Sequence, residues 1–394
     1  MRGRMWLEAR EITVAGAGIA GLAVACALAQ RGARVRVLEQ APDLSEVGAG
    51  LQVSPNGWRV IEALGLGAAL GDVATESGAV VLRSHATGGE VLRMPLAGRG
   101  RFGLVHRADL LAVLRAGAEA AGVAIETGAR VASVFLGRHG ALLEMADGGR
   151  RSVPFLVGAD GLRSRLRAAL MGDVAPAFTG QVAWRALVDA PPGIAREAHV
   201  FMGPGRHVVA YPLRDGRLLN LVAVEERKAW AAEGWHHAGD ADALRRAFAE
   251  FGGPVPGWLS RVETPMIWGL FRHPVATRWW APGVALIGDA AHPTLPFLAQ
   301  GANMALEDAW TLAAALDSGP DEAVLPAWQA ARAPRCDRIV EAATANARNY
   351  HLRGVRRVVG HALLRRLNRT APGRALDRFD WLYGFDPTGH DAAG

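Results

Sequence analysis

The stretch at residues 12–39, ITVAGAGIAGLAVACALAQRGARVRVLE, constrains the fold of this chain more than any other. It begins with an apolar, β-branched run, passes through Gly16, Gly18 and Gly21 in G-x-G-x-x-G spacing, and continues as an apolar run of helical length. A second apolar run ends at Glu39, about twenty residues beyond the glycines. Strand, glycine turn, helix, strand and acid, in this order, predict a dinucleotide-binding βαβ unit.

The three glycines and the acid have distinct parts in such a unit. Gly16 permits the tight turn, Gly18 lets the backbone approach a pyrophosphate, and Gly21 lets the helix pack close to the strand. The helix N-terminus offers free N–H groups and a partial positive charge to the phosphates, and Glu39 would accept hydrogen bonds from a ribose. The unit serves NAD and FAD equally, so other residues must distinguish them.

Composition and charge bound the remaining choices. The chain has 394 residues, 50% of them hydrophobic, which is enough for two domains or for one domain with a large insertion. Its formal net charge of +6 admits anionic small molecules, acidic membrane surfaces or nucleic acid, but no nucleic-acid motif accompanies it.

Cys26 and Cys336 show no disulfide or metal-site spacing, which suits a reducing cytoplasm and predicts no metal. No apolar run outside residues 12–28 is long enough to cross a membrane, so we expect no integral membrane segment.

Two patterns alternate along the chain. Residues 181–267 carry alternating apolar segments, among them VAWRALV, HVVAYPL and LLNLVAVEE, which are typical of an antiparallel sheet. At Gly283 a buried-strand pattern returns with VALIGD, followed by a long helical run. We therefore predict an α/β fold with a Rossmann-like, discontinuous nucleotide domain and a β-rich substrate domain. The nucleotide domain is expected at residues 1–75, 100–180 and 270–325, the substrate domain at residues 76–99 and 181–269, and a helical C-terminal region at residues 326–394.

Two further turns follow predicted strands: Asp160 with Gly161, and Gly288 with Asp289. An NAD dehydrogenase needs only the glycine turn, so these two favour a flavin cofactor. Asp289 could bond a polyol hydroxyl. Backbone N–H groups at the start of the next helix could bind the pyrimidine end of a flavin, and the helix dipole would stabilise the negative charge of its reduced form. These N–H groups belong to Gln300, Gly301, Ala302 and Asn303.

Three motifs, in order along the chain, resemble those of the FAD-dependent aromatic hydroxylases, which are single-component flavoprotein monooxygenases. The motifs are GAGIAG with Glu39, GADGLRSRLR, and GDAAHPTLPFLAQGANMALEDAW. The chain is most similar to the subgroup of salicylate 1-hydroxylase, 3-hydroxybenzoate 6-hydroxylase and 6-hydroxynicotinate 3-monooxygenase, and the resemblance covers nearly its whole length. It implies that the loop at residues 296–303, beginning with Pro296, lines the isoalloxazine ring. It also implies FAD contacts from Gly16, Gly18, Gly21, Glu39, Arg107, Asp160, Gly161 and Asp289.

Arg107 is placed by the chain itself at a predicted strand-to-helix corner, in VHRADL. There an arginine can face phosphate or ribose, and the alternative is a surface residue.

The resemblance implies the reaction. The enzyme is expected to hydroxylate a small phenolic carboxylate, such as salicylate or 3-hydroxybenzoate, with O2 and with NADH or NADPH. NAD(P)H would reduce the flavin, the turn at Asp160 assisting, and O2 would add to give a C4a-hydroperoxide that delivers oxygen to the ring. A phenol is activated when its hydroxyl proton leaves, so the site needs a base that works near neutral pH and must exclude water.

His207 is the candidate base, and Tyr211 is its partner. Both lie in HVVAYPL on a predicted strand, and residues four apart point to the same face of a strand. The family resemblance also places a His-x-x-x-Tyr pair here. The alternative is a structural histidine beside a packed tyrosine. Arg185, in VAWRAL, could attract a carboxylate or NAD(P)H, or could form an exposed salt bridge.

Other functions stay open. A hydroxylase of a quinone precursor or of a biosynthetic aromatic keeps the chemistry and changes the substrate. An NAD-linked dehydrogenase predicts a colourless protein with no need for Asp160 or Asp289. A non-catalytic flavin-binding protein predicts a yellow protein without substrate-stimulated NAD(P)H oxidation. The arginines at residues 353–378 are typical of a solvated helix face, with a homodimer surface or an acidic membrane contact as alternatives.

Overall fold

The computed structural model describes residues 6–44, 49–228 and 237–389. Its first sheet has strand order β19-β20-β12-β1-β2-β8, parallel throughout except for the edge pair of β19 and β20. Since parallel strands share one carboxyl edge, the segments that follow β1, β12 and β20 emerge side by side. The strands are β1 (Glu11–Ala15), β2 (Arg34–Leu38), β8 (Ala124–Glu126), β12 (Leu156–Gly158), β19 (Trp280–Ala281) and β20 (Val284–Leu286).

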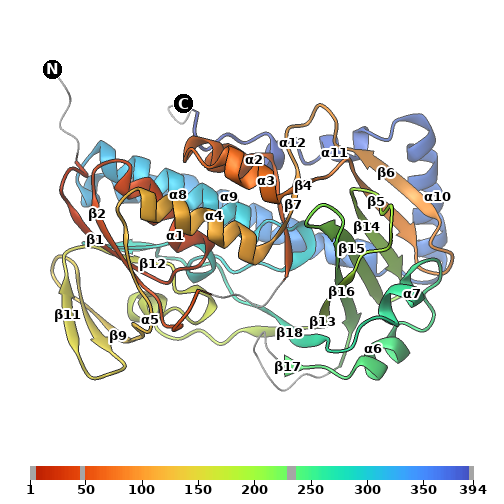
Figure 1. Ribbon diagram of the computed structural model, residues 1–394, viewed down its shortest axis with the longest axis horizontal. Helices are drawn as coiled ribbons and strands as arrows, with labels where there is room; N and C mark the ends of the chain where they lie inside the picture. Colours follow the sequence, from red (N-terminus) through yellow and green to blue (C-terminus); the bar gives the residue numbers. More distant parts are fainter. Residues whose placement is uncertain (1–5, 45–48, 229–236, 390–394) are drawn as a thin grey trace.

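Helices cover this sheet, with α1 (Ile19–Ala29) at their centre. Residues 19–28 of α1 are all buried, because the helix packs against the sheet, α4 (Arg107–Ala120) and α8 (Gly301–Ser318) (Figure 1). Its alanines and glycine let these neighbours approach closely. The same region holds α2 (Pro55–Ala63), α3 (Gly67–Val73) and α5 (Arg165–Met171).

Two three-stranded sheets flank this layer. One has the order β3-β7-β4 and the other β11-β10-β9. In the first, β7 runs directly into α4, so the corner between them is part of a paired strand. The strands are β3 (Gly50–Val53), β4 (Thr75–Glu76), β7 (Gly103–His106), β9 (Val131–Leu136), β10 (Ala141–Met145) and β11 (Arg150–Val153).

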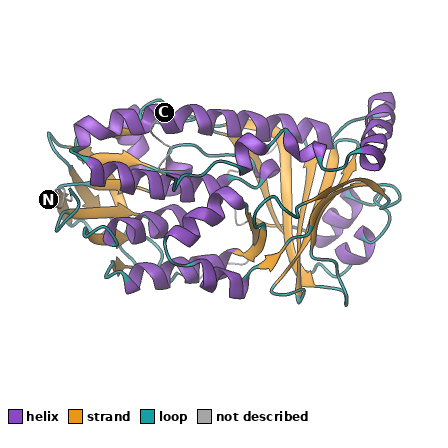
Figure 2. Ribbon diagram, turned by 90° about the horizontal axis from the view of Figure 1, so that it is seen from above, coloured by secondary structure: helices purple, strands orange, loops and turns teal. Residues whose placement is uncertain are grey.

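The largest sheet has eight strands in the order β17-β18-β13-β16-β15-β14-β5-β6, gathered at one end of the molecule (Figure 2). The block expected to be antiparallel is so, but β5 joins β14 in parallel. This join unites the two segments of the expected substrate domain. The strands are β5 (Ala79–Ser84), β6 (Glu90–Pro95), β13 (Ala177–Asp189), β14 (Glu197–Gly203), β15 (Arg206–Leu213), β16 (Leu218–Glu226), β17 (His237–Ala238) and β18 (Met266–Arg272).

The two faces of this sheet have different partners. Along β15, Val208 and Ala210 point to one face and pack in a core with residues of α6 (Ala241–Ala247) and α7 (Val255–Leu259). His207, Val209 and Tyr211 alternate with them and point to the other face, where they line a cavity. Covering one face with helices therefore leaves the other for a ligand.

The C-terminal part of the chain is helical, as expected, and α8 and α9 (Asp321–Tyr350) run along the long axis of the molecule (Figure 1). Helix α10 (Gly354–Thr370) packs on β6 at the end of the large sheet. It leaves Val355, Val358, Val359 and Leu363 exposed. The short helices α11 (Arg374–Asp377) and α12 (Asp380–Tyr383) return toward α2.

The predicted α/β fold with a β-rich region and a helical C-terminal region is confirmed. Helix α2 starts at Pro55, because proline is well suited to the first turn of a helix. Helix α4 starts at Arg107, at the predicted strand-to-helix corner. Among the described residues, no helix has both the length and the apolar character needed to span a bilayer.

Candidate active site

The three predicted turns meet at the carboxyl edge of the parallel sheet. A Cβ on Gly16 would lie 2.5 Å from the Ala159 carbonyl oxygen, so the first turn touches the second. Arg167, after the second turn, donates to the Asp289 and Ala290 carbonyl oxygens of the third, at 3.4 and 3.3 Å. The sequence motifs, far apart in the chain, thus form one surface.

The glycine turn is shaped as a phosphate-binding loop requires. Gly16 has a φ of +99°, which L-residues with side chains rarely adopt, and a Cβ on Gly21 would lie only 1.9 Å from the Gly16 carbonyl oxygen. Gly18, by contrast, has no atom within 4 Å of its would-be Cβ. The first and third glycines are therefore needed by the protein itself, and the open space at the second fits the approach of a pyrophosphate.

Glu39 is held directly beneath this loop. Its Oε2 accepts the Ala17 N–H at 2.7 Å, and its Oε1 accepts the Ala41 N–H at 2.9 Å. Each oxygen keeps a lone pair, so the carboxylate can still accept ribose hydroxyls. This carboxylate acceptor beside the glycine turn fits the ADP part of a dinucleotide.

Asp160 and Gly161 make the second turn. The Asp160 Oδ2 accepts the Arg165 N–H at 2.7 Å, which ties the turn to the start of α5, while its buried Oδ1 has no hydrogen-bond partner. Burial raises the pKa of Asp160, and hydrogen bonds from Ser164 and Arg165 oppose the rise. Gly161 has a φ of +72°. Neither residue lines the central cavity, so the structure places this turn beside the nucleotide loop and away from the substrate side.

A cavity of about 550 Å³ lies between the turns and the large sheet. From the predicted cofactor set it is lined by Gly18, Arg107, Asp289, Pro296, Gly301 and Ala302. From the predicted substrate side it is lined by Arg185, His207 and Tyr211. The cavity therefore joins the expected flavin end to the expected aromatic site.

Asp289 and Arg107 both line the cofactor end of this cavity. Reduced hydration raises the pKa of Asp289, and the charges of His292 and Arg107 oppose that rise. The Arg107 N–H donates to the Ala49 carbonyl oxygen at 2.8 Å, which fixes the corner between β7 and α4. A carboxylate and a guanidinium on one wall can bind a polyol chain and a phosphate, respectively.

The loop at residues 296–303 turns through Ala299, whose φ is +53°, and enters α8. Asn303 does not point into the cavity: its Nδ2 donates to the Gln52 and Ala299 carbonyl oxygens, and its Oδ1 accepts the Ser54 N–H at 3.0 Å. Only the backbone N–H of Asn303 thus stays available to a flavin. Together with Gly301 and Ala302, it belongs to the first turn of α8, where N–H groups have no intrahelical acceptor.

A buried polar network behind this loop was missed by sequence reasoning. The Asn56 Nδ2 donates to Gln300 Oε1 at 3.1 Å and to Glu307 Oε1 at 2.7 Å. Glu307 also pairs with Arg332 and Arg335 of α9. The signal in the sequence was a fully buried glutamate within an apolar helix, which requires a partner. This network fastens α2, the loop at residues 296–303 and α9 together.

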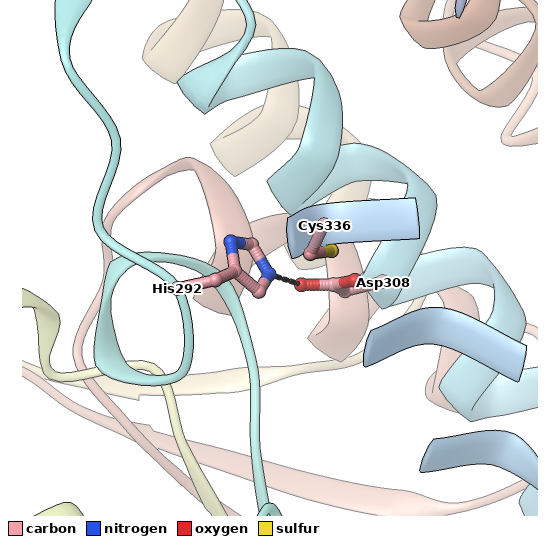
Figure 3. A group of neighbouring side chains, drawn as sticks. All are labelled: His292, Asp308 and Cys336. Atoms are coloured by element: carbon pink, nitrogen blue, oxygen red, sulfur yellow. Dashed lines mark hydrogen bonds and ion pairs between the residues drawn. The ribbon is translucent and has the colours of Figure 1, made fainter. Parts of the chain in front are cut away.

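His292, Asp308 and Cys336 form a second buried group below the third turn (Figure 3). Their ligand atoms lie within 4.8 Å of one another, but Asp308 also accepts the Gly288 N–H at 2.9 Å and the Arg332 Nη2 at 2.8 Å. Burial lowers the pKa of His292, yet the Asp308 carboxylate outweighs it and holds that pKa well above its ordinary value. Since two cationic side chains already satisfy the carboxylate, we assign this group to holding the Gly288 turn.

His207, Tyr211 and Arg185 share one face of the large sheet. Arg185 pairs with Val222, and Val222 pairs with Val209, which lies midway between His207 and Tyr211 on β15. Directly opposed residues of antiparallel strands project to the same side. The expected pair and the arginine are thus brought together around an otherwise apolar wall.

His207 is buried between aromatic neighbours and a second histidine. Its ring centroid lies 5.6 Å from that of Phe297 and 5.2 Å from that of Tyr350, and its Nδ1 lies 2.7 Å from the Nε2 of His351. Burial, with a smaller effect of His351, lowers the pKa of His207 well below its ordinary value. The side chain is therefore neutral at pH 7 and carries a lone pair.

Tyr211 stays protonated for a related reason. Burial raises the pKa of its phenol, while the charge of Arg185 opposes the rise. At neutral pH it can donate a hydrogen bond to an oxygen in the cavity.

Comparison with known proteins agrees with this geometry. A family model described as an FAD binding domain matches residues 9–343. The chain is 36% identical over 386 residues to 3-amino-4-hydroxybenzoate 2-monooxygenase of Streptomyces cremeus, covering 95% of this chain and 94% of that relative. It is 35% identical over 395 residues to 3-hydroxybenzoate 6-hydroxylase of Polaromonas naphthalenivorans, covering 95% of this chain and 96% of that relative.

Solved structures of flavoproteins have the same fold as this chain. Klebsiella pneumoniae HpxO complexed with FAD and uric acid superimposes with a TM-score of 0.83 at 26% identity, covering 96% of this chain and 98% of that one. A salicylate hydroxylase substrate complex shares the fold, with a TM-score of 0.80 at 24% identity and 96% of each chain covered.

Proposed function

Because the chain belongs to the FAD binding domain family and its relatives are monooxygenases, we propose that it is an FAD-dependent hydroxylase of a small phenolic carboxylate. The reaction uses O2 and either NADH or NADPH. The substrate class is that of hydroxybenzoates such as 3-hydroxybenzoate and salicylate. One observation carries the proposal: His207, Tyr211 and Arg185 line the same cavity as Asp289 and the flavin loop.

FAD would be held by the residues that fit its parts. Gly16, Gly18, Gly21 and Glu39 would hold the ADP moiety, with Arg107 toward the phosphates. Asp289 would accept hydrogen bonds from the ribityl chain, and Asp160 with Gly161 would close the cofactor site from the side. The N–H groups of Gly301, Ala302 and Asn303 would face the pyrimidine end, with Pro296 beside the ring. When bound and reduced by NAD(P)H, FAD would activate O2 for transfer to the aromatic ring.

The large sheet would then bind and activate the aromatic ring. Arg185 would pair with the substrate carboxylate, because it brings a positive charge to a mostly apolar wall. Tyr211 would donate a hydrogen bond to the phenolic oxygen of the substrate. Neutral His207 would accept the proton of the substrate hydroxyl. The apolar neighbours Val209, Val222 and Phe297 would exclude water from the ring.

A second substrate class has support of its own. The relative named 3-amino-4-hydroxybenzoate 2-monooxygenase is as similar to this chain as the 3-hydroxybenzoate enzyme. An aminated biosynthetic benzoate is therefore the second candidate, and the proposed cavity chemistry is the same.

Three further proposals concern the whole chain. We place the FAD-binding domain at residues 1–75, 100–180 and 270–325 and the substrate domain at residues 76–99 and 181–269. We also propose a cytoplasmic enzyme and a homodimer that buries the exposed apolar face of α10. Light scattering on the purified protein tests the dimer.

A substrate panel tests the proposed function. NADH and NADPH oxidation, ring product and hydrogen peroxide are to be recorded with salicylate, 3-hydroxybenzoate, 3-amino-4-hydroxybenzoate and 6-hydroxynicotinate. We expect a yellow protein in which a hydroxybenzoate stimulates NAD(P)H oxidation and is hydroxylated. A colourless protein that FAD cannot reconstitute, or a yellow protein that no panel member stimulates, would contradict the proposal.

A further inference from the structure

A chain of titratable side chains runs from the cavity to the protein surface. The His207 Nδ1 lies 2.7 Å from the His351 Nε2, and the His351 Nδ1 lies 3.1 Å from the Glu226 Oε1. His207 is 1% exposed and His351 is 6% exposed, whereas the Glu226 side chain is 41% exposed. Each link is within hydrogen-bond reach, and the last carboxylate meets solvent.

The donors and acceptors along this chain can be assigned. A carboxylate only accepts, so the His351 Nδ1 must carry a hydrogen. Neutral His351 then has its lone pair on Nε2, so the His207 Nδ1 must carry a hydrogen as well. The lone pair of His207 is thereby placed on Nε2, the nitrogen that does not face His351. Glu226 therefore determines, through His351, which nitrogen of His207 is basic.

The groups around the chain are consistent with this assignment. Arg353, at the start of α10, pairs with the other Glu226 oxygen. Gln181 Nε2 lies 3.4 Å from the His351 Nδ1, farther away than the carboxylate oxygen. Burial lowers the pKa of His351, while Glu226 opposes this and Arg353 reinforces it. Tyr350 contacts the His207 ring, and its phenol stays neutral because burial raises its pKa.

We propose that His351 and Glu226 form a proton-exit path for the substrate hydroxyl, with His207 at its inner end. The proposal rests on the proposed function, in which His207 accepts the phenolic proton. His351 and Glu226 touch neither substrate nor FAD, so they act as positioning and proton-carrying residues for His207.

The transfer balances at each link. The phenolic O–H bond breaks and an N–H bond forms at His207 Nε2, while the hydrogen on His207 Nδ1 moves to His351 Nε2. The hydrogen on His351 Nδ1 then moves to Glu226 Oε1, which releases it to water. The substrate becomes a phenolate and one proton reaches solvent. The same path run in reverse returns a proton to the product oxygen and restores both tautomers.

The path also explains how a buried imidazole can serve as a base. An isolated imidazolium in the apolar cavity wall would be costly, because it would have lost its hydration. If the proton passes on as it arrives, no net charge needs to remain on His207. The half-exposed carboxylate then carries the proton where water can accept it.

A chromophoric phenol separates proton transfer from binding. The probe is 3-hydroxy-4-nitrobenzoate, whose phenolate absorbs visible light, bound to the FAD-containing enzyme without NAD(P)H. A stopped-flow pH jump gives the rate at which the bound probe ionises, and a pH titration gives its equilibrium. Glu226→Gln keeps a hydrogen-bond acceptor for His351 but removes the proton acceptor. Glu90→Gln is the matched control, since Glu90 is also half-buried on the large sheet and paired with an arginine.

We expect Glu226→Gln to slow ionisation about ten-fold or more, with probe affinity nearly unchanged, and Glu90→Gln to match the wild type. His351→Gly should be slow and should recover with added imidazole. Wild-type rates in both Glu226→Gln and His351→Gly overturn the path, as does a loss of affinity without a loss of rate. A wild-type enzyme that neither binds the probe nor hydroxylates any benzoate overturns the proposed function instead, and the path falls with it.

Discussion

Gly21 packs directly against the Gly16 carbonyl oxygen, at a distance that leaves no room for a side chain between α1 and the first turn. Gly18, between them, borders open space and has an ordinary φ of −74°. Two glycines of one motif therefore have different physical duties. Gly21 is required by the packing of α1 against the first turn, and we propose that Gly18 leaves room for the pyrophosphate.

Replacing these two glycines should separate the duties. Gly21→Ala should cost about 2 kcal/mol or more of unfolding free energy, because the methyl group overlaps backbone. Gly18→Val should change the stability of the apoprotein by less than about 0.5 kcal/mol but should weaken FAD binding, since the side chain would occupy the pyrophosphate position. Urea unfolding of the apoproteins and fluorescence titration with FAD measure both. Equal loss of stability in the two variants would contradict this division.

Asp289 should control flavin retention. Asp289→Ala removes an acceptor for the ribityl chain, and a hydrogen bond to a charged group is worth about 1.5–3 kcal/mol, so the Kd for FAD should rise about ten-fold or more. Asp289→Asn keeps an acceptor oxygen, so its Kd for FAD should lie between those of the wild type and of Asp289→Ala. Flavin absorbance per protein after gel filtration checks the order. An alanine variant with full flavin occupancy would show that the carboxylate does not contact FAD.

Asp160 should affect flavin reduction more than aromatic binding. It borders the nucleotide loop and lies outside the cavity, so Asp160→Ala should slow anaerobic reduction by NAD(P)H about ten-fold, as expected for loss of about 1.4 kcal/mol at a charged contact. Asp160→Asn retains the acceptor for Arg165 and controls for the turn itself. If reduction keeps its wild-type rate while substrate affinity falls, the assignment of this turn is wrong.

Much of the fold could be predicted because its signals are local. The glycine spacing and Glu39 lie within one stretch, and each of the three turns directly follows its own strand. The join between β5 and β14 could not be predicted, since it brings together strands separated by about a hundred residues and has no turn chemistry of its own. The commitment of the Asn303 side chain to Ser54, 249 residues away, is hidden for the same reason.

The candidate site shows the same limit. His207 and Tyr211 could be singled out because they share one short strand and one face. The partner of His207 could not, since His351 lies 144 residues later, just after α9, in a segment that carries no motif. Burial and pKa depend on such distant partners. Sequence spacing alone therefore predicts which residues share a strand face, but it does not predict their protonation.

His199 should make stability fall in mild acid. Burial, with the charges of Arg83 and Arg93, lowers its pKa to about 4 against the opposing effect of Glu197. Between pH 6.5 and about 4, His199 stays neutral in the folded protein but binds a proton in the unfolded chain. Its contribution to the free energy of unfolding is therefore present above pH 6.5 and is lost as the pH falls toward 4. The shift of 6.5 − 4 = 2.5 units corresponds to about 3 kcal/mol. His199→Asn should flatten the pH dependence of urea unfolding between pH 7 and 5, and an unchanged slope would contradict this.

His207→Ala should uncouple NAD(P)H oxidation from hydroxylation. Hydride transfer needs no phenolate, so flavin reduction should stay near the wild-type rate. Ring attack does need one, so product formation should fall about a hundred-fold at neutral pH and hydrogen peroxide should appear in its place. Coupling should recover as the pH rises and the phenol ionises without help.

Tyr211→Phe keeps the base and removes only the donated hydrogen bond, so it should lose coupling less severely. The measurement is product formed per NAD(P)H oxidised from pH 6 to 9. Full coupling of His207→Ala at neutral pH would show that another group takes the proton, while leaving the flavoprotein assignment intact.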